Sequence, residues 1–350
     1  MRGRATVPQM RWLAAVRTAL AALAARMALT PRTAVTARTA TAPRTARAAL
    51  VMLVAGSLVT ACGTAGGASS LSKLGAGRVI AVAAAENFWG SIARQLGGKH
   101  VHVTSIIVNP NTDPHSYEPT AGDARAMAGA QLVIENGIGY DPWAARLLAA
   151  NDDSQPVLNV GGMLRITDGG NPHRWYNPSD VRQVISQLTA DYRHLDPADA
   201  SYFTAQRDRF EKTALRQYDS LIARIRGKYA STPVGASESI FAMLAPALGL
   251  RLITPASFLE AVSEGGEVSA ADKQTIDNQI RHHLIKIYVY NSQNVTPDVQ
   301  AQLNEAKAAH IPVATITETL TPPGNTFQAW QVRQLRGIEA ALADATGRNG

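Results

Sequence analysis

Cysteine is almost absent from the 350-residue sequence, which contains a single one, Cys62. An intrachain disulfide is therefore excluded. The sequence also lacks a Walker motif, a Gly-x-Ser-x-Gly motif and a His-Glu-x-x-His motif, so it gives no sign of nucleotide hydrolysis or of these hydrolase types. The apolar run over 48–61 has 14 residues, which is too short to span a bilayer, because a spanning helix needs about 20.

Acidic residues are missing from the first 61 positions, which instead hold nine arginines. The formal net charge of +7 comes from this segment, because the remainder of the chain contains two more acids than bases. A basic body that would bind nucleic acid is therefore excluded, and we expect no nucleic-acid partner. The hydrophobic content of 46% and the charged content of 17% are typical of a globular chain with enough apolar residues for a core.

The segment 1–61 has the features of an export leader. Arg44 and Arg47 precede the apolar run, whose length suits the apolar region of an export signal. Small residues then lead to Cys62, an arrangement that resembles a bacterial lipobox, although a buried free cysteine is the alternative. We predict a lipoprotein export signal within 1–61 and a flexible tether over 62–78. Two acyl chains on Cys62 would anchor the protein in the cell envelope, at the outer face of the cytoplasmic membrane.

Strand-like and helix-like stretches alternate twice along the rest of the chain. Strand patterns occur at 79–85, 101–108, 132–136 and 157–160, with helical patterns between them. The same order returns after residue 230, with strands at 233–236, 251–255, 286–290 and 312–317. This alternation predicts an α/β fold of two lobes, over 79–195 and 230–350, each a mainly parallel sheet wrapped by helices.

The segment 196–229 joins the two predicted lobes. It has no proline after Pro197, its only glycine is Gly227, and apolar residues recur at helical spacing from Phe203 to Tyr229. A helix of this length would be about 50 Å long at a rise of about 1.5 Å per residue. We therefore predict one long, rigid α-helix that spans both lobes.

Two of the eight histidines stand out. The other six flank the start of a strand or end a helix, where a surface or capping role explains an imidazole. His115 and His173 instead follow a proline, in loops directly after the second and fourth predicted strands. Ligands of open parallel sheets bind at this edge, and proline restricts the backbone that presents each ring. The two histidines are therefore candidate binding residues.

Both histidine loops resemble those of a known family. The stretches 113–120 (DPHSYEPT) and 171–178 (NPHRWYNP) resemble the two signature loops of the zinc- and manganese-binding solute-binding lipoproteins of ABC importers. The resemblance covers about 79–345 and includes 134–137 (IENG) and 311–323 (IPVATITETLTPP). It implies two α/β lobes joined by one long helix, in agreement with the alternation of strands and helices.

The resemblance also implies a set of metal ligands. The two signature histidines correspond to His115 and His173. The third ligand, a His in zinc-type and a Glu in manganese-type members, corresponds to Glu238, and the fourth, a carboxylate after the last strand, corresponds to Glu318. Two neutral imidazoles and two carboxylates suit one divalent cation. We expect protons to weaken binding below about pH 6 at the histidines, and near about pH 4 at the carboxylates.

The expected function is capture and not catalysis. The chain would bind one zinc or manganese ion as cargo and deliver it, as a monomer, to an ABC importer permease with its ATPase. An exported metalloenzyme, such as a hydrolase, is one alternative, but four protein ligands leave no open position for a catalytic water. A two-lobed binder of a siderophore or cobalamin is another, and it would need a wide aromatic or basic cleft. The sequence departs from the family at 151–172, which has no histidine, and at Asn291, near which the family often has Glu.

Overall fold

The structure is a computed structural model that describes residues 79–150 and 155–348. The leader predicted over 1–61, Cys62 and the tether predicted over 62–78 lie outside the described residues. None of the described helices is both long enough and apolar enough to cross a membrane.

A parallel sheet of four strands, in the order β2-β1-β3-β4, forms the centre of the first lobe. Its central strand β1 is buried along nearly its whole length, as expected for a parallel strand that is covered by helices on both faces. The elements of this lobe are β1 (Ile80–Glu86), α2 (Asn87–Gly97), η1 (Gly98–His100), β2 (Val101–Ile107), α3 (Ala121–Ala128), β3 (Leu132–Glu135), α4 (Pro142–Ala149), β4 (Val157–Asn159), α5 (Val160–Leu164), η2 (Arg174–Tyr176) and α6 (Pro178–Leu195).

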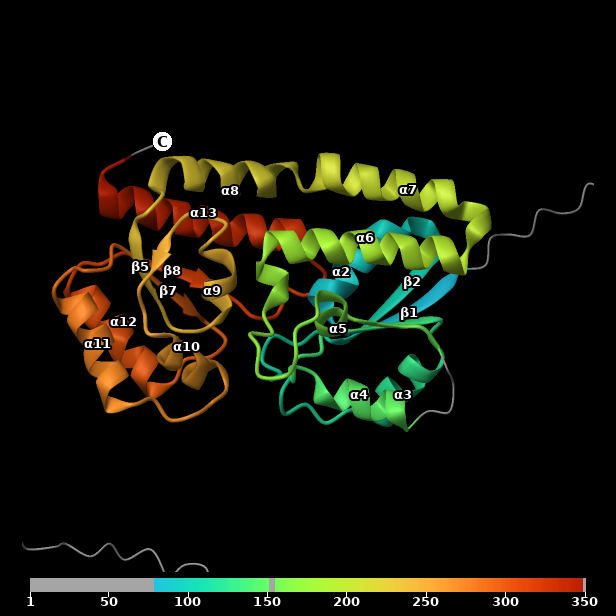
Figure 1. Cartoon of the computed structure of the whole chain (residues 1–350), viewed down its shortest axis with the longest axis horizontal. Coiled ribbons are helices and arrows are strands. Elements are labelled where there is room, and N and C mark those ends of the chain that lie inside the picture. The colour runs from blue at the N-terminus through green and yellow to red at the C-terminus, as the bar shows by residue number, and fades with distance from the viewer. Residues whose placement is uncertain (1–78, 151–154, 349–350) are drawn as a thin grey trace, which may run out of the picture. The chain divides into compact units, whose positions relative to one another are not determined.

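The second lobe repeats this strand order with a parallel sheet β6-β5-β7-β8. Figure 1 shows the two sheets, each with its own helices, and the predicted α/β fold of two lobes is confirmed. The elements are β5 (Pro233–Ala236), α9 (Ile240–Leu244), β6 (Arg251–Leu252), α10 (Ala256–Ser263), α11 (Ala270–Arg281), β7 (Tyr288–Asn291), α12 (Pro297–Ala308), β8 (Val313–Ile316) and α13 (Phe327–Thr346).

The connection over 196–229 is helical, but it is not the single unbroken α-helix that the sequence predicted. It consists of a 3₁₀ turn, η3 (Pro197–Asp199), then α7 (Ala200–Arg209), a π-helical turn, η4 (Phe210–Ala214), and α8 (Arg216–Tyr229). At the π turn the Leu215 N–H donates to the Phe210 carbonyl, five residues earlier, at 2.9 Å. Because the turn is wider, Phe210 and Leu215 are both buried. In a regular α-helix with 3.6 residues per turn, two residues five positions apart would lie on different faces of the helix.

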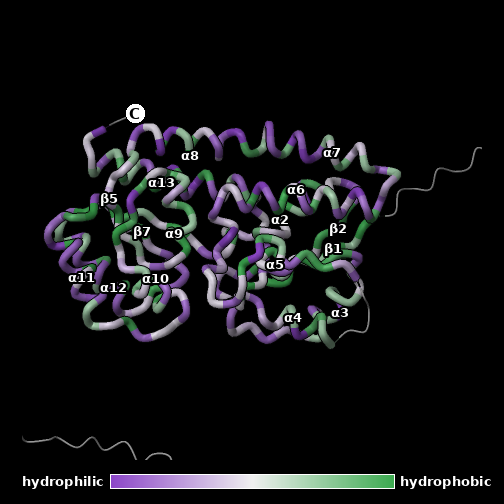
Figure 2. The backbone as a smooth tube through the Cα atoms, in the orientation of Figure 1, coloured by the Kyte–Doolittle hydropathy of each residue, from purple (hydrophilic) through white to green (hydrophobic). Residues whose placement is uncertain are grey.

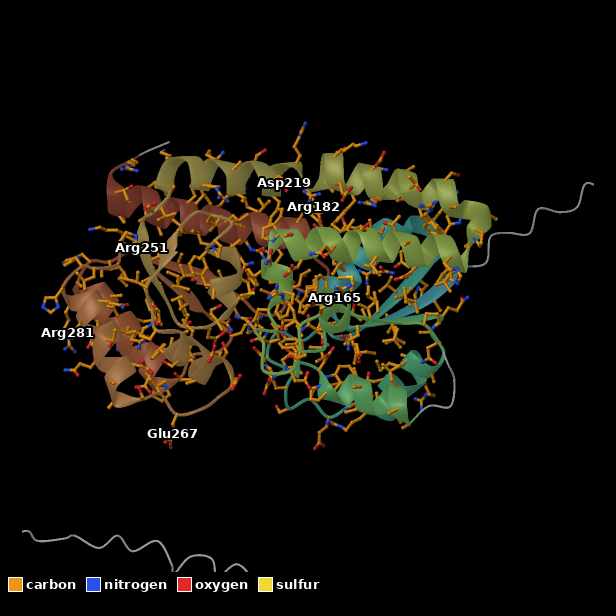
Figure 3. All side chains as sticks on the ribbon, viewed as in Figure 1. Arg165, Arg182, Asp219, Arg251, Glu267 and Arg281 are labelled. Carbon is orange, nitrogen blue, oxygen red and sulfur yellow. The ribbon has the colours of Figure 1, made fainter. Side chains whose placement is uncertain are left out.

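The helical connection packs along both lobes with one side. α7 contacts α2 and α6 of the first lobe, and α8 contacts α13. In Figure 2 the tube of α7 is mostly purple, while β1 and β2 are largely green. Within α7 only Phe203 is buried, so most of its side chains are in contact with solvent. Arg182 of α6 and Asp219 of α8 also meet (Figure 3), with Nη2 of the arginine 2.7 and 2.6 Å from the two carboxylate oxygens. This pair is half exposed, so its contribution to stability is small.

The C-terminal helix α13 touches both lobes as well. At its start, the Phe327 N–H donates to Ser91 Oγ of α2 at 2.9 Å, and the amide groups of Gln328 and Gln95 bond to each other. Farther along, α13 packs against β8 and α8. One buried apolar cluster includes residues of both lobes. Two helical elements and a shared core therefore hold the lobes together.

Candidate metal centre

The imidazole of His173 is oriented by Asn171 of its own loop, and Ser239 Oγ of the second lobe also lies 3.2 Å from its Nδ1. Asn171 Oδ1 accepts the backbone N–H of His173 at 3.0 Å and lies 2.9 Å from its Nδ1. The Asn171 amide also donates to the Ser239 carbonyl of the second lobe at 2.7 Å. With Nδ1 protonated toward Asn171, Nε2 keeps its lone pair. Burial lowers the pKa of His173, although the nearby Glu318 opposes this effect, so the ring is neutral at neutral pH.

His115 lies in the loop after β2, which Asp113 holds in a tight turn. Asp113 Oδ1 accepts the His115 N–H at 2.9 Å, and its Oδ2 accepts the Ser116 hydroxyl at 2.7 Å. The ring of His115 meets the ring of Tyr140 edge to face, with centroids 5.0 Å apart, and Tyr140 meets His173 in the same way at 6.0 Å. Tyr140 therefore lies against both imidazoles.

Glu238 follows β5 and is 2% exposed. Its Oε2 accepts a hydrogen bond from Asn291 Nδ2 at 3.0 Å, but its Oε1 is buried without a hydrogen-bond partner. Burial, together with the charge of Glu318, raises the pKa of Glu238 to about 8. A buried carboxyl group with an unpartnered oxygen requires either a proton or a cation.

Glu318 follows β8 and completes the group. Its Oε1 accepts the Tyr140 hydroxyl at 2.9 Å and lies 3.9 Å from His173 Nε2, while its Oε2 is 3.4 Å from Asn291 Nδ2. Burial alone would raise the pKa of Glu318, but the hydrogen bond and charge of His173, together with Tyr140, bring it below its usual value. Glu318 is therefore ionised, and Asn291 lies between it and Glu238.

His173 and Glu318, which come from different lobes, lie 3.9 Å apart, whereas no three of the four predicted ligands have donor atoms that all lie within 4.8 Å of one another. His115 and Glu318 line a cavity of about 320 Å³ between loops of the two lobes, and both histidines line a neighbouring cavity of about 190 Å³. No lysine or arginine is among the residues that line these two cavities. The surroundings therefore attract a cation.

A different trio has its donor atoms closer together. His100, Asp196 and Asp199 each offer a donor atom within 4.8 Å of the others, closer than any other three potential ligands among the described residues. His100 Nδ1 lies 2.5 Å from Asp199 Oδ2, so the imidazole and the carboxylate are already partners of each other. No group of this trio requires a cation in the way that the buried carboxyl group of Glu238 does. The trio is therefore the weaker candidate for a metal site. His100 was not among the predicted ligands, and no local pattern links it to aspartates about a hundred positions away.

The sequence profile described as zinc-uptake complex component A, periplasmic (ZnuA), matches residues 82–341. The chain belongs to this family. The resemblance inferred from the two histidine loops is therefore confirmed, and the ZnuA family accounts for both lobes and the connection between them.

Curated relatives differ in the metal that their names carry. The manganese-binding lipoprotein MntA of Halalkalibacterium halodurans is 25% identical over 167 residues, which is 46% of this chain and 54% of that protein. The zinc-binding protein TroA of Treponema pallidum is 25% identical over 50% of this chain and 58% of its own length. The chain thus spans little more than half the length of these relatives. Membership of the ZnuA family identifies the class of protein. The names of the relatives differ in the metal, so they do not identify the metal that this chain binds.

Solved structures share the fold. The manganese-bound periplasmic metal-binding protein of Candidatus Liberibacter asiaticus has a TM-score of 0.63 and 20% identity, over 75% of this chain and 98% of that one. A nickel complex of the solute-binding protein FpvC of Pseudomonas aeruginosa has a TM-score of 0.62 and 19% identity, over 77% of this chain and 99% of that one. The two-lobed fold of this chain is therefore that of known metal-binding proteins.

Three neighbours of the predicted ligands were not predicted. Asn171 begins the 171–178 stretch but was assigned no role there, and Tyr140 and Ser239 were assigned none either. All three contact His173 or Glu318. Their only sequence signal is position, because two of them stand next to a predicted ligand or within two residues of one. Asn291 was flagged as a departure from the family, and it lies between the two carboxylates.

Proposed function

We propose that the chain captures one divalent transition-metal cation, zinc or manganese, through His115, His173, Glu238 and Glu318. The observation that carries this proposal is the buried Glu238, which has an unpartnered oxygen and lies near a second carboxylate, Glu318. Glu318 in turn lies 3.9 Å from the neutral imidazole of His173. Two carboxylates and two neutral imidazoles around a divalent ion leave no net charge in the buried site. Each lobe supplies two ligands, so the bound ion would hold the lobes together.

Two opposed tendencies determine which metal ion the proposed site prefers. Two carboxylate ligands suit manganese, because it prefers oxygen, whereas almost any such site binds zinc more tightly. Analysis of the metal content of protein purified from its native envelope decides between them. The result also bears on the alternatives, because a siderophore or cobalamin would be recovered as an organic ligand.

A metal ion fits the cavities better than a chelate. Their volumes, about 320 and 190 Å³, lie at or below the lower end of sites for larger organic ligands, about 300–1,000 Å³. Their lining offers no basic side chain for an anionic siderophore. A hydrolase would need an open metal position and a separate general base, and the ZnuA family is one of solute-binding proteins.

Delivery to the membrane is the second part of the proposal. We infer that the protein serves an ABC importer, whose permease and ATPase are separate chains, and that lipid on Cys62 anchors it through the tether 62–78. The division into lobes over 79–195 and 230–350, a connection over 196–229 and a monomeric state belong to the same proposal. A C62A variant should be released from the membrane or stay uncleaved, whereas native protein that retains residues 1–61 would contradict the anchor.

The ligand set is tested by calorimetric metal titration of the wild type and of single variants. We expect one ion per chain, and a loss of affinity of at least about tenfold for H115A and for H173A. H100A is the matched control, because His100 belongs to the competing trio, and it should bind the metal as the wild type does. A double variant H115A/H173A that still binds one ion tightly would refute the proposed site, and an affinity lost only in H100A would move it to the trio.

A further inference from the structure

Three acidic side chains lie buried together at the carboxyl edge of the first sheet. Glu86 ends β1, Glu135 ends the neighbouring strand β3, and Asp141 directly precedes α4. Their exposed fractions are 1%, 6% and 2%. The charged groups that face Glu86 are Asp141 and Glu135, and Tyr140 also lies close, but no lysine or arginine among the described residues acts on it. Three buried carboxylates without a cation cannot all be ionised.

Hydrogen bonds distinguish the three groups. Asp141 accepts the backbone N–H groups of Asn136 and Gly137 at 2.7 and 2.8 Å. Glu135 accepts the Asn159 amide at 2.7 Å. Both oxygens of Glu86, in contrast, are buried without any donor. Donated hydrogen bonds stabilise the ionised form of a carboxyl group. Asp141 and Glu135 are therefore ionised more readily than Glu86.

The electrostatics of Glu86 agree with this order. Burial raises the pKa of Glu86 well above its usual value, and the charges of Asp141 and then Glu135 raise it further. Burial also raises the pKa of Asp141, but its backbone donors and its contact with Glu86 act in the opposite direction. A proton shared by the two groups is therefore held by Glu86.

We propose that Glu86 and Asp141 form a buried proton-binding site, in which Glu86 is a neutral carboxylic acid that shares its proton with the carboxylate of Asp141. This site supports the loop of His173. Asp141 holds the amides of Asn136 and Gly137, and Asn136 Nδ2 in turn donates to the carbonyl of Pro172 at 3.0 Å. Loss of the proton would leave two like charges together without a cation, at the base of that support. The proposal stands on the first lobe alone and does not depend on metal binding.

The first test is the pH dependence of reversible denaturant unfolding for metal-free wild type and E86Q. Glutamine has the shape of the neutral acid and can donate to Asp141. The native wild type binds one proton that its unfolded chain releases above the usual pKa of Glu, so its stability is complete at low pH and declines as pH rises toward the raised value. The unfolding constant of the wild type, relative to that of E86Q, should therefore rise about tenfold per pH unit from above the usual pKa of Glu up to the raised pKa of Glu86.

E267Q is the matched control. Glu267 is exposed and points away from the second lobe (Figure 3), so this variant should follow the wild-type pH profile. Parallel profiles of wild type and E86Q would overturn the proposal. Stabilisation of the wild type, but not of E86Q, by sodium, potassium or calcium ions would also overturn it, because the site would then hold a metal cation and not a proton.

Infrared spectroscopy is the second test and does not require E86Q to be stable. Glu238, Glu135 and Asp180 are other buried carboxyl groups with a raised pKa and an unpartnered oxygen, so the measurement uses metal-free E238Q and compares it with E86Q/E238Q. The carbonyl band of a neutral carboxylic acid should be present at pH 7 in E238Q and lose the intensity of one carboxyl group in E86Q/E238Q. Its absence from E238Q would overturn the proposal.

A third measurement separates this site from the metal centre. E86Q should bind zinc at pH 7 within about twofold of the wild-type affinity, because it replaces one neutral group with another. A tenfold loss would show that Glu86 carries a charge in the native protein, and would overturn the proposal. If the wild type bound no metal at all, the proposed function would fail while the unfolding and infrared tests would still decide this inference.

Discussion

The buried carboxyl group of Glu238 makes the stability of the metal-free protein depend on pH. Its pKa is raised from 4.5 to about 8 by burial and by Glu318, so the metal-free native protein holds a proton there that the unfolded chain releases. This contribution to stability is complete below about pH 4.5 and is lost as the pH rises through about 8. Relative to E238Q, the free energy of unfolding should fall by about 1.4 kcal/mol per pH unit between about pH 5 and 8. Denaturant titrations of metal-free wild type and E238Q at several pH values measure this difference. An equal pH dependence of the free energy of unfolding in the two proteins would contradict the prediction.

The same proton competes with the metal. Because Glu238 must lose it to become a ligand, the affinity should fall by about tenfold per pH unit below about pH 8. This onset is higher than the one near pH 4 that the sequence suggested for the carboxylates. Burial lowers the pKa of His173, so proton competition at that ring begins below its usual range. Competition titrations with a chelator at several pH values test this, and an affinity that is constant between pH 8 and 6 would exclude Glu238 as a ligand.

Asn171 would affect a metal bound by His173 without contacting that metal itself. It fixes Nδ1 as the protonated nitrogen and so leaves Nε2 free. Substitutions of such partners typically lower metal affinity by about 10–100-fold, and we expect N171A to fall in this range by calorimetry. N278A is the control, because Asn278 lies exposed on α11. Equal affinities of the two variants would show that the orientation of His173 is fixed by other contacts.

At the scale of the elements, α13 depends on a hydroxyl of α2. Ser91 is buried and accepts the Phe327 N–H, which begins α13. The S91A variant leaves this amide without a partner, and we expect it to lower the free energy of unfolding by about 1–3 kcal/mol. In S220A the lost hydroxyl is exposed and bonds only to its own helix, so the change should be within about 0.5 kcal/mol. Equal values in thermal or denaturant unfolding would show that packing alone holds α13.

The π turn affects how the helical connection over 196–229 packs. It lets one helical connection bury Phe210 and Leu215 against both lobes. α-Helical hydrogen bonds continue on either side, through α7 and α8. The connection is therefore a continuous support with one local irregularity.

At the scale of the whole molecule, packing restricts how the lobes can move. They share a buried apolar cluster, and α13 and the helical connection contact both. A wide hinge motion would break these contacts, so we expect metal-free and metal-bound forms to have the same radius of gyration. Changes should concentrate in 236–270, which includes Glu238 and the segment after α10 that contains Gly265, a residue with positive φ. Small-angle scattering and hydrogen exchange test this, and a large change in radius of gyration would contradict it.

The sequence alone determined the two sheets and the two histidine loops. Apolar runs and Pro-His pairs are local patterns that can be identified from neighbouring residues, and they place His115 and His173 after strands whatever the rest of the chain does. The identity of Glu238 and Glu318 as candidate ligands came from a resemblance, because a lone carboxylate after a strand has no distinguishing pattern of its own.

Tertiary structure decided what surrounds those residues. Tyr140 and Glu318 are 178 positions apart, and Asn291 and Glu238 are 53 apart, so no local pattern could pair them. The raised pKa of Glu238, the orientation of His173 and the unpartnered carboxyl of Glu86 arise from burial and from neighbours that meet only in the folded chain. The π turn is similar, because the local sequence permits an unbroken helix, and the requirement to bury Leu215 against the packed core exists only in the folded chain.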